Sequence, residues 1–141
     1  MNRIIIYNTY KATIAIGLQD GYSTKKIEEA EVINFLQRLQ NTLIAEKHIY
    51  MSANCYTSNM VLSGQIEPHL NLELINYPIA SLHEDDSTAE RIFKEVVEDL
   101  VTRLMVEFSQ NRVVIQFHDS NVMLEKSKDI DPRIGGVLKT H

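Results

Sequence analysis

Apolar residues recur at three- and four-residue intervals between positions 89 and 108, which is the period of one face of an α-helix. The pattern predicts an amphipathic helix that begins near Ser87, because Ser87 and Glu90 have the spacing of a capping box. A helix of about 20 residues is roughly 30 Å long and can lie across three or four strands. We therefore expect the rest of the chain to supply a sheet against which this helix packs.

The other segments supply four strands, a second helix and a short extra strand. Alternation of apolar residues predicts a long first strand from Ile4 to Leu18, with the even positions inward. A helical period follows at residues 27–43, and strand patterns follow at residues 49–62, 70–74, 113–117 and 122–124. This order predicts an α+β fold with a ferredoxin-like β-α-β-β-α-β sheet, two helices on one face and a short C-terminal extra strand.

Two strands of this sheet have faces that the pattern does not assign to the core. The odd positions of the first strand include Tyr7, Thr9 and Lys11, and neither face of residues 49–62 is strongly apolar. The second of these strands is therefore expected at an edge or at a subunit contact. Because a monomer would leave both surfaces incompletely covered, we expect a homo-oligomer.

Length and composition indicate one soluble domain. The chain has 141 residues, of which residues 1–125 are expected to form a single domain and residues 126–141 a C-terminal tail. The net charge of −5 argues against binding of polymeric nucleic acid, which needs clustered basic residues. The single cysteine suits a reducing cytoplasm, and the absence of a run of 18 apolar residues argues against a membrane span.

The sequence shows no recognisable catalytic, cofactor or metal motif. The five histidines do not have metal-ligand spacing, and phosphate-binding glycine loops are absent. We therefore predict no metal, no cofactor and no enzymatic activity. His118 and Asp119 are adjacent, so at a strand end they point to opposite faces and are expected to be loop residues.

Polar and aromatic residues near the predicted strand ends are the candidates for ligand binding. Arg112 offers a planar donor fork for phosphate, and Asn76 and Asp119 can bind a base edge or ribose hydroxyls. Tyr10 and Tyr22 can stack on a purine ring. The alternative interpretation, in which all five are turn, edge or surface residues, stays open.

Several short strings, in this order, resemble the phage Thoeris anti-defence proteins of the first type, which sequester a nucleotide signal. The strings are Tyr7-Asn8-Thr9-Tyr10 continuing through Ile14-Ala15-Ile16-Gly17-Leu18 to Gly21-Tyr22, then Leu74-Ile75-Asn76-Tyr77-Pro78, Arg112-Val113, and Asp119 followed by Met123-Leu124-Glu125. The resemblance covers residues 4–125. The sequence departs from that family in its long segment 48–67 and in the tail after Lys126.

The resemblance implies a non-enzymatic sponge in the cytoplasm of an infected bacterial host. It implies dimers assembled into a hexamer that binds a cyclic ADP-ribose isomer, and some members of that family also bind cyclic oligonucleotides. By this likeness Asn76, Arg112 and Asp119 lie at the ligand, with Tyr10 and Tyr22 lining it. Two alternatives remain: a hydrolase or isomerase of a small nucleotide with Asp119 or His118 as general base, and a structural or interaction domain without a small ligand.

Overall fold

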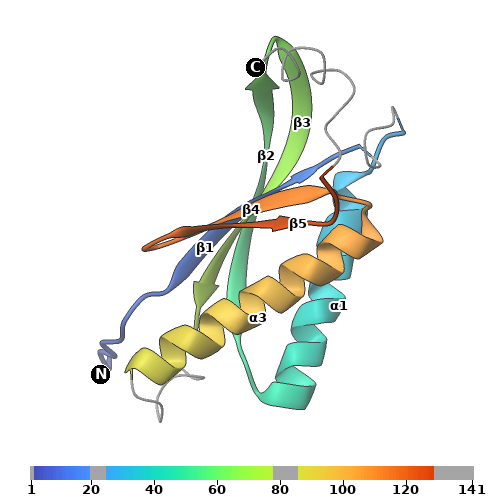
Figure 1. Ribbon diagram of the computed structural model, residues 1–141. Helices are drawn as coiled ribbons and strands as arrows, with labels where there is room; N and C mark the ends of the chain where they lie inside the picture. Colours follow the sequence, from blue (N-terminus) through green and yellow to red (C-terminus); the bar gives the residue numbers. More distant parts are fainter. Residues whose placement is uncertain (1, 20–24, 78–85, 129–141) are drawn as a thin grey trace.

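The computed structural model describes residues 2–19, 25–77 and 86–128 (Figure 1). Its sheet has the strand order β2-β3-β1-β4-β5, and all neighbouring strands are antiparallel. This is the predicted ferredoxin-like arrangement, with the predicted fifth strand added at one edge, so the fold prediction is confirmed. The elements are β1 (Lys11–Gly17), α1 (Glu29–Lys47), β2 (Met51–Leu62), β3 (Gln65–Asn76), α3 (Asp86–Glu107), β4 (Arg112–Phe117) and β5 (Asn121–Glu125).

The core lies between the sheet and the two helices, which cover the same face of the sheet (Figure 1). Alternate residues of the central strands point into it because successive strand side chains face opposite ways. Ile14, Leu72 and Ile115 are among the fully buried side chains. The opposite face carries Lys11 and Glu73, whose side chains form an ion pair of 3.1 Å. No element of the described residues covers this opposite face, which we call the uncovered face.

The first strand is shorter than predicted. It begins at Lys11, and the first residue pair with β3 is Lys11 with Ile75. Because β3 ends at Asn76, no strand of the described residues lies beside residues 4–9, and Ile4 and Ile6 are 85% and 93% exposed. The expected strand from Ile4 is therefore wrong, and Tyr7 and Thr9 are not part of a sheet face.

The β2–β3 hairpin is longer than predicted, since β3 begins at Gln65 rather than near Leu70. Its turn residues Ser63 and Gly64 have positive φ angles of 51° and 78°, as in the type I′ turns of two-residue hairpin loops. β2 is an edge strand, as expected, and Met51, Ala53 and Cys55 are its core-facing residues.

A buried glutamine joins the end of α3 to the end of β1. Gln110 is 8% exposed, and its Oε1 accepts a 2.9 Å hydrogen bond from the backbone N–H of Gly17. Its Nε2 donates to the carbonyl oxygens of Gly17 and Phe108, each at 3.0 Å. The side chain thus supplies partners for backbone groups that the sheet and the helix do not pair, and it fixes the position of α3 on the sheet.

The described chain continues briefly past β5. The N–H of Lys126 donates to the Asn111 carbonyl, and the N–H of Ser127 donates to Asn111 Oδ1. The division between a domain and a tail at residue 125 stays a prediction, because most of the expected tail lies outside the described residues. Among the described helices, none is long and apolar enough to cross a membrane.

Candidate functional site

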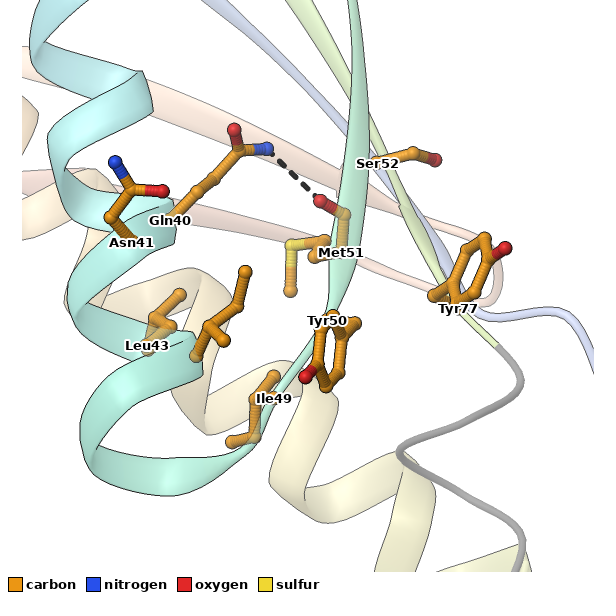
Figure 2. Close-up of a pocket in the computed structure, with 9 residues that line it drawn as sticks. Gln40, Asn41, Leu43, Ile49, Tyr50, Met51, Ser52 and Tyr77 are labelled. Atoms are coloured by element: carbon orange, nitrogen blue, oxygen red, sulfur yellow. Dashed lines mark hydrogen bonds between the residues drawn. The ribbon is translucent and has the colours of Figure 1, made fainter.

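Two adjoining depressions lie where β1 and β2 begin and β3 ends. The first, which we call the α3 depression, has a volume of about 160 Å³ and is bounded by Tyr10, Asn76 and the first turns of α3. The second, the α1 depression, has a volume of about 220 Å³ and lies between α1 and the start of β2 (Figure 2). This end of the sheet is therefore the candidate site.

The two depressions share one wall. Ile49, Tyr50, Met51 and Tyr77 line both of them. The N–H of Tyr77 donates a 3.3 Å hydrogen bond to the carbonyl oxygen of Tyr50, which continues the β2–β3 pairing by one residue beyond Met51 and Asn76. Tyr77 is 48% exposed, so much of its side chain is available to a ligand.

Asn76 positions the backbone at the floor of the α3 depression. Its side chain is buried, and its Oδ1 accepts a 2.8 Å hydrogen bond from the N–H of Tyr10. Its Nδ2 donates to the carbonyl oxygen of Asn8 at 2.9 Å. The amide is thus engaged by the chain that enters β1, which gives Asn76 a structural role at the site. The expected contact of Asn76 with a ligand stays a prediction.

Replacement of Asn76 by alanine is expected to lower the free energy of unfolding by about 1–3 kcal/mol, because it leaves the buried Tyr10 N–H without its acceptor. Urea denaturation of the two proteins measures the difference. Asn71→Ala is the control, since the Asn71 amide bonds Tyr56 and Ser58 at an exposed position. An equal loss of stability in both variants would contradict the assigned role.

The side chain of Tyr10 packs between two other rings. Its ring centroid lies 6.0 Å from that of Phe93 and 5.5 Å from that of His118. Tyr10 is only 6% exposed. It lines the α3 depression, but most of its surface is already covered by protein. The expected contact of Tyr10 with a ligand stays a prediction.

A network of ionisable side chains reaches Tyr10 through the ring of His118. Lys94 Nζ is 2.9 Å from Asp119 and 3.4 Å from Glu90, and His118 Nε2 is 3.3 Å from Glu90 Oε1. The hydrogen bond from Lys94 holds the pKa of Asp119 below its ordinary value, and the same bond raises the pKa of Lys94. A carboxylate whose pKa is lowered is a weak base, so the network does not favour Asp119 as a general base.

The same groups have the composition of a metal site. Single ligand atoms of Glu90, His118 and Asp119 lie within 4.8 Å of one another. The Lys94 ammonium, however, already contacts both carboxylates and supplies the positive charge between them. An ion pair network accounts for the cluster without a metal.

One of the expected ligand residues, Arg112, is not brought to this end of the sheet. Arg112 begins β4 and Asp119 lies two residues beyond its last residue, so the length of the strand, about 20 Å, separates them. Arg112 Nη2 lies 2.8 Å from Glu125 Oε1 and bonds the Ser127 carbonyl. Tyr22 lies outside the described residues. The expected convergence of Asn76, Arg112 and Asp119 is therefore not observed.

The sequence alone did not identify several residues of this site. Glu90 was assigned to a capping box with Ser87, but α3 begins at Asp86, so Ser87 lies inside the helix, and the Glu90 carboxylate contacts Lys94 and His118. The four-residue spacing of Glu90 and Lys94 was the available signal. Tyr50 lies in the strand predicted at residues 49–62, and Tyr77 follows the strand predicted at residues 70–74. Only the pairing of β2 with β3 places the two residues together.

Comparison with known proteins identifies the family. The family model for SAM lyase matches residues 7–124. A phage SAM lyase in the apo state matches with a TM-score of 0.57 and 15% sequence identity, over 86% of this chain and 91% of that chain. A phage SAM lyase in complex with S-methyl-5′-thioadenosine matches with a TM-score of 0.53 and 16% identity, over 92% of this chain and 99% of that chain. No curated protein matches the chain.

These findings overturn the functional prediction from sequence. The sponge for a cyclic ADP-ribose isomer or cyclic oligonucleotide is wrong, and so is the prediction of no enzymatic activity, because the matching family is one of lyases. The alternative of an enzyme acting on a small nucleotide fits better, although a lyase is neither a hydrolase nor an isomerase. The homo-oligomer stays a prediction. With a family model matching residues 7–124, the chain belongs to the SAM lyase family.

Proposed function

We propose that the protein cleaves S-adenosylmethionine and releases S-methyl-5′-thioadenosine. The observation that carries this proposal is the match of the SAM lyase model to residues 7–124. The solved phage SAM lyase in complex with S-methyl-5′-thioadenosine supports it. We also propose that the protein acts in the cytoplasm of an infected bacterial host, since both matching structures are phage enzymes.

The identity of the product defines the bond that breaks. S-methyl-5′-thioadenosine keeps the methyl group and the ribose carbon on sulfur, so the bond lost is that between sulfur and Cγ of the methionine part. The electron pair of this bond goes to sulfur, and the sulfonium becomes a neutral thioether. The α-carboxylate of the substrate supplies a lone pair from oxygen to Cγ, which closes a five-membered lactone without water or an oxidant.

This reaction needs little from the protein besides binding and orientation. The nucleophile and the leaving group belong to one molecule, so holding the carboxylate close to Cγ supplies most of the catalysis. No proton is removed, which agrees with the lowered pKa of Asp119 and its poor suitability as a base. The proposal therefore explains an enzyme whose sequence has no catalytic motif.

The surroundings of the α3 depression suit a reaction that removes charge. A sulfonium and a carboxylate react to give two groups without net charge, so surroundings of low polarity disfavour the charged ground state more than the transition state. Ala89, Ile92 and Phe93 give the α3 depression an apolar wall. Phe93 belongs to the buried core, so this wall is fixed by packing.

The test is incubation of the protein with S-adenosylmethionine and analysis of the products by mass spectrometry. We expect S-methyl-5′-thioadenosine and homoserine lactone in equal amounts. S-adenosylhomocysteine is the control substrate. Its neutral sulfur is a poor leaving group, so we expect the protein not to cleave this compound. Failure to form S-methyl-5′-thioadenosine from S-adenosylmethionine would refute the proposal.

Labelled water separates a lyase from a hydrolase. In H₂¹⁸O, attack of water at Cγ places the label in the γ-hydroxyl of homoserine, whereas closure of the lactone followed by its opening places the label in the carboxyl group. We expect label only in the carboxyl group. Label in the hydroxyl would assign the protein to the hydrolases.

A further inference from the structure

We infer that His118 is a positioning residue for the candidate site and that it acts only while its imidazole ring is neutral. In this form the ring holds the chain that enters β1, and with it Tyr10, at the wall of the α3 depression. The effect on catalysis rests on the proposed function. The hydrogen bond and the charge state that produce it are properties of the protein alone and can be measured without substrate.

The ring of His118 takes the place of a strand carbonyl at the end of the β1–β4 pairing. The N–H of His118 donates to the Lys11 carbonyl oxygen at 3.0 Å. In a regular antiparallel pair, the N–H of the opposite residue donates back to a backbone carbonyl. Here the N–H of Lys11 donates instead to Nδ1 of the His118 ring, at 3.4 Å. The imidazole therefore extends the pairing of the two strands by one residue beyond Ala12 and Phe117.

This hydrogen bond determines which ring nitrogen of the neutral His118 carries the proton. A backbone N–H is always a donor, so Nδ1 accepts and carries no hydrogen. The proton of the neutral ring then lies on Nε2, which is 3.3 Å from Glu90 Oε1 and can donate to it. The bond to β1 and the bond to α3 thus suit the same tautomer, and together they fix the plane of the ring.

The fixed ring covers one side of Tyr10, which lines the α3 depression. Its centroid lies 5.5 Å from that of the Tyr10 ring, and Phe93 packs on Tyr10 at 6.0 Å. From the β3 side, Asn76 Oδ1 accepts the N–H of Tyr10 at 2.8 Å. From the β4 side, His118 accepts the N–H of the next residue, Lys11. Two side chains, an amide and an imidazole, therefore hold this part of the wall between the two neighbouring strands.

Protonation of His118 breaks one of its two bonds. Both nitrogens of an imidazolium ring are donors, so Nδ1–H then faces the N–H of Lys11 without an acceptor between them. The contact with Glu90 remains and becomes an ion pair. The bond to Lys11 is therefore present above the pH at which His118 titrates and is lost below it, which leaves Tyr10 held from the β3 side alone.

The other charged groups around the ring do not replace this acceptor. Helix α3 contributes Glu90 and Lys94, the turn after β4 contributes Asp119, and the Lys11 ammonium lies on the uncovered face. Both carboxylates already contact Lys94. The hydrogen bond between Lys94 and Asp119 raises the pKa of the first and lowers that of the second, so both keep their charge where histidine titrates.

The test is the pH profile of KM for S-adenosylmethionine between about pH 8 and 5.5, the range in which histidine titrates. We expect the wild-type KM to rise about 2- to 10-fold towards pH 5.5, the factor of one hydrogen bond, with little change in kcat. His118→Asn supplies an amide oxygen near the position of Nδ1 and does not titrate, so it should lack this rise. His118→Phe keeps a ring without an acceptor and should have a raised KM throughout the range.

Two further variants separate His118 from other sources of pH dependence. His48→Asn removes the other histidine that lines the α3 depression, and asparagine tolerates the positive φ of 54° at this position. This variant should keep the rise in KM. Asn76→Ala removes the bond on the β3 side and should raise KM at both ends of the pH range. Titration of the substrate itself acts on all variants alike, so differences between their profiles report on the protein.

Nitrogen NMR of the imidazole rings tests the same bond without substrate. We expect the proton of the His118 ring on Nε2 at pH 8, and protons on both nitrogens at low pH together with a shift of the Lys11 amide resonance. A proton on Nδ1 at pH 8 would overturn the inference, whether or not the protein cleaves S-adenosylmethionine. An active enzyme in which the wild type and His118→Asn share one pH profile of KM would also overturn it, while the proposed function stands.

Discussion

Replacement of Ala89 by arginine is expected to lower kcat/KM for S-adenosylmethionine by on the order of 10²-fold, the effect of a misplaced substrate. Ala89 is partly buried in the first turns of α3 and lines the α3 depression. Arginine is a good helix former, so the helix should persist. Its long side chain fills the α3 depression and adds a positive charge that repels the sulfonium of the proposed substrate.

The matched control is Val106→Arg, which introduces the same side chain on the same helix. Val106 is 70% exposed and does not line either depression. Its variant should keep wild-type kinetics. Thermal unfolding of both variants separates a blocked site from a damaged fold. Tyr56 lies on the uncovered face of the sheet. Full activity of Ala89→Arg together with loss of activity in Tyr56→Ala would therefore show that the active site lies on that face.

Replacement of Gln110 by leucine is expected to lower the free energy of unfolding by about 2–5 kcal/mol. Leucine fills similar space but leaves the Gly17 N–H and C=O without the bonds that Gln110 makes. Each buried polar group without a partner costs about 1–3 kcal/mol. For a chain of this size the loss corresponds to a fall in Tm of roughly 10 °C.

Gln116→Leu is the control for this variant, because Gln116 is exposed on β4. Its effect should stay within about 0.5 kcal/mol. Gln110 lies at the end of the sheet away from Tyr10 and Asn76, so the folded fraction of Gln110→Leu should keep its KM. A loss of stability no larger than that of Gln116→Leu would show that water replaces the glutamine without cost.

The fold could be predicted because the sequence patterns that determine its strands and helices are local. Alternation in β1 and β3 and the helical period of α3 each lie within one segment, and burial of Ile14, Leu72 and Val97 follows from them. The length of β1 could not be predicted in this way. Residues 4–9 have strand composition, and only the end of β3 at Asn76 leaves them without a paired strand in the described part of the chain.

The site was less predictable because its contacts cross the chain. The bonds of the Asn76 amide reach residues 66 and 68 positions away, and Glu90 meets His118 across 28 positions. A local pattern gave each residue a plausible turn or capping role. Arg112 was placed with Asp119 by its position at a strand end, although the two lie at opposite ends of β4.

The error about enzymatic activity has a chemical cause. The sequence has no motif for a nucleophile, a general base or a metal site. That absence favours a binding protein over an enzyme. In the proposed reaction the substrate contains its own nucleophile and leaving group, so the protein needs no motif of that kind. The short strings that suggested the sponge consist largely of strand and turn residues, which many α+β sheets share.

The long β2–β3 hairpin gives the protein a natural point of attachment. Its turn at Ser63 and Gly64 is separated from Tyr50 and Tyr77 by the length of the two strands, about 40 Å. Apart from its two chain neighbours, no described residue comes within 4 Å of the position that a Cβ would take at Gly64. A fluorophore or a surface linker joined to an inserted residue at this turn would report on single molecules while leaving the candidate site facing solution.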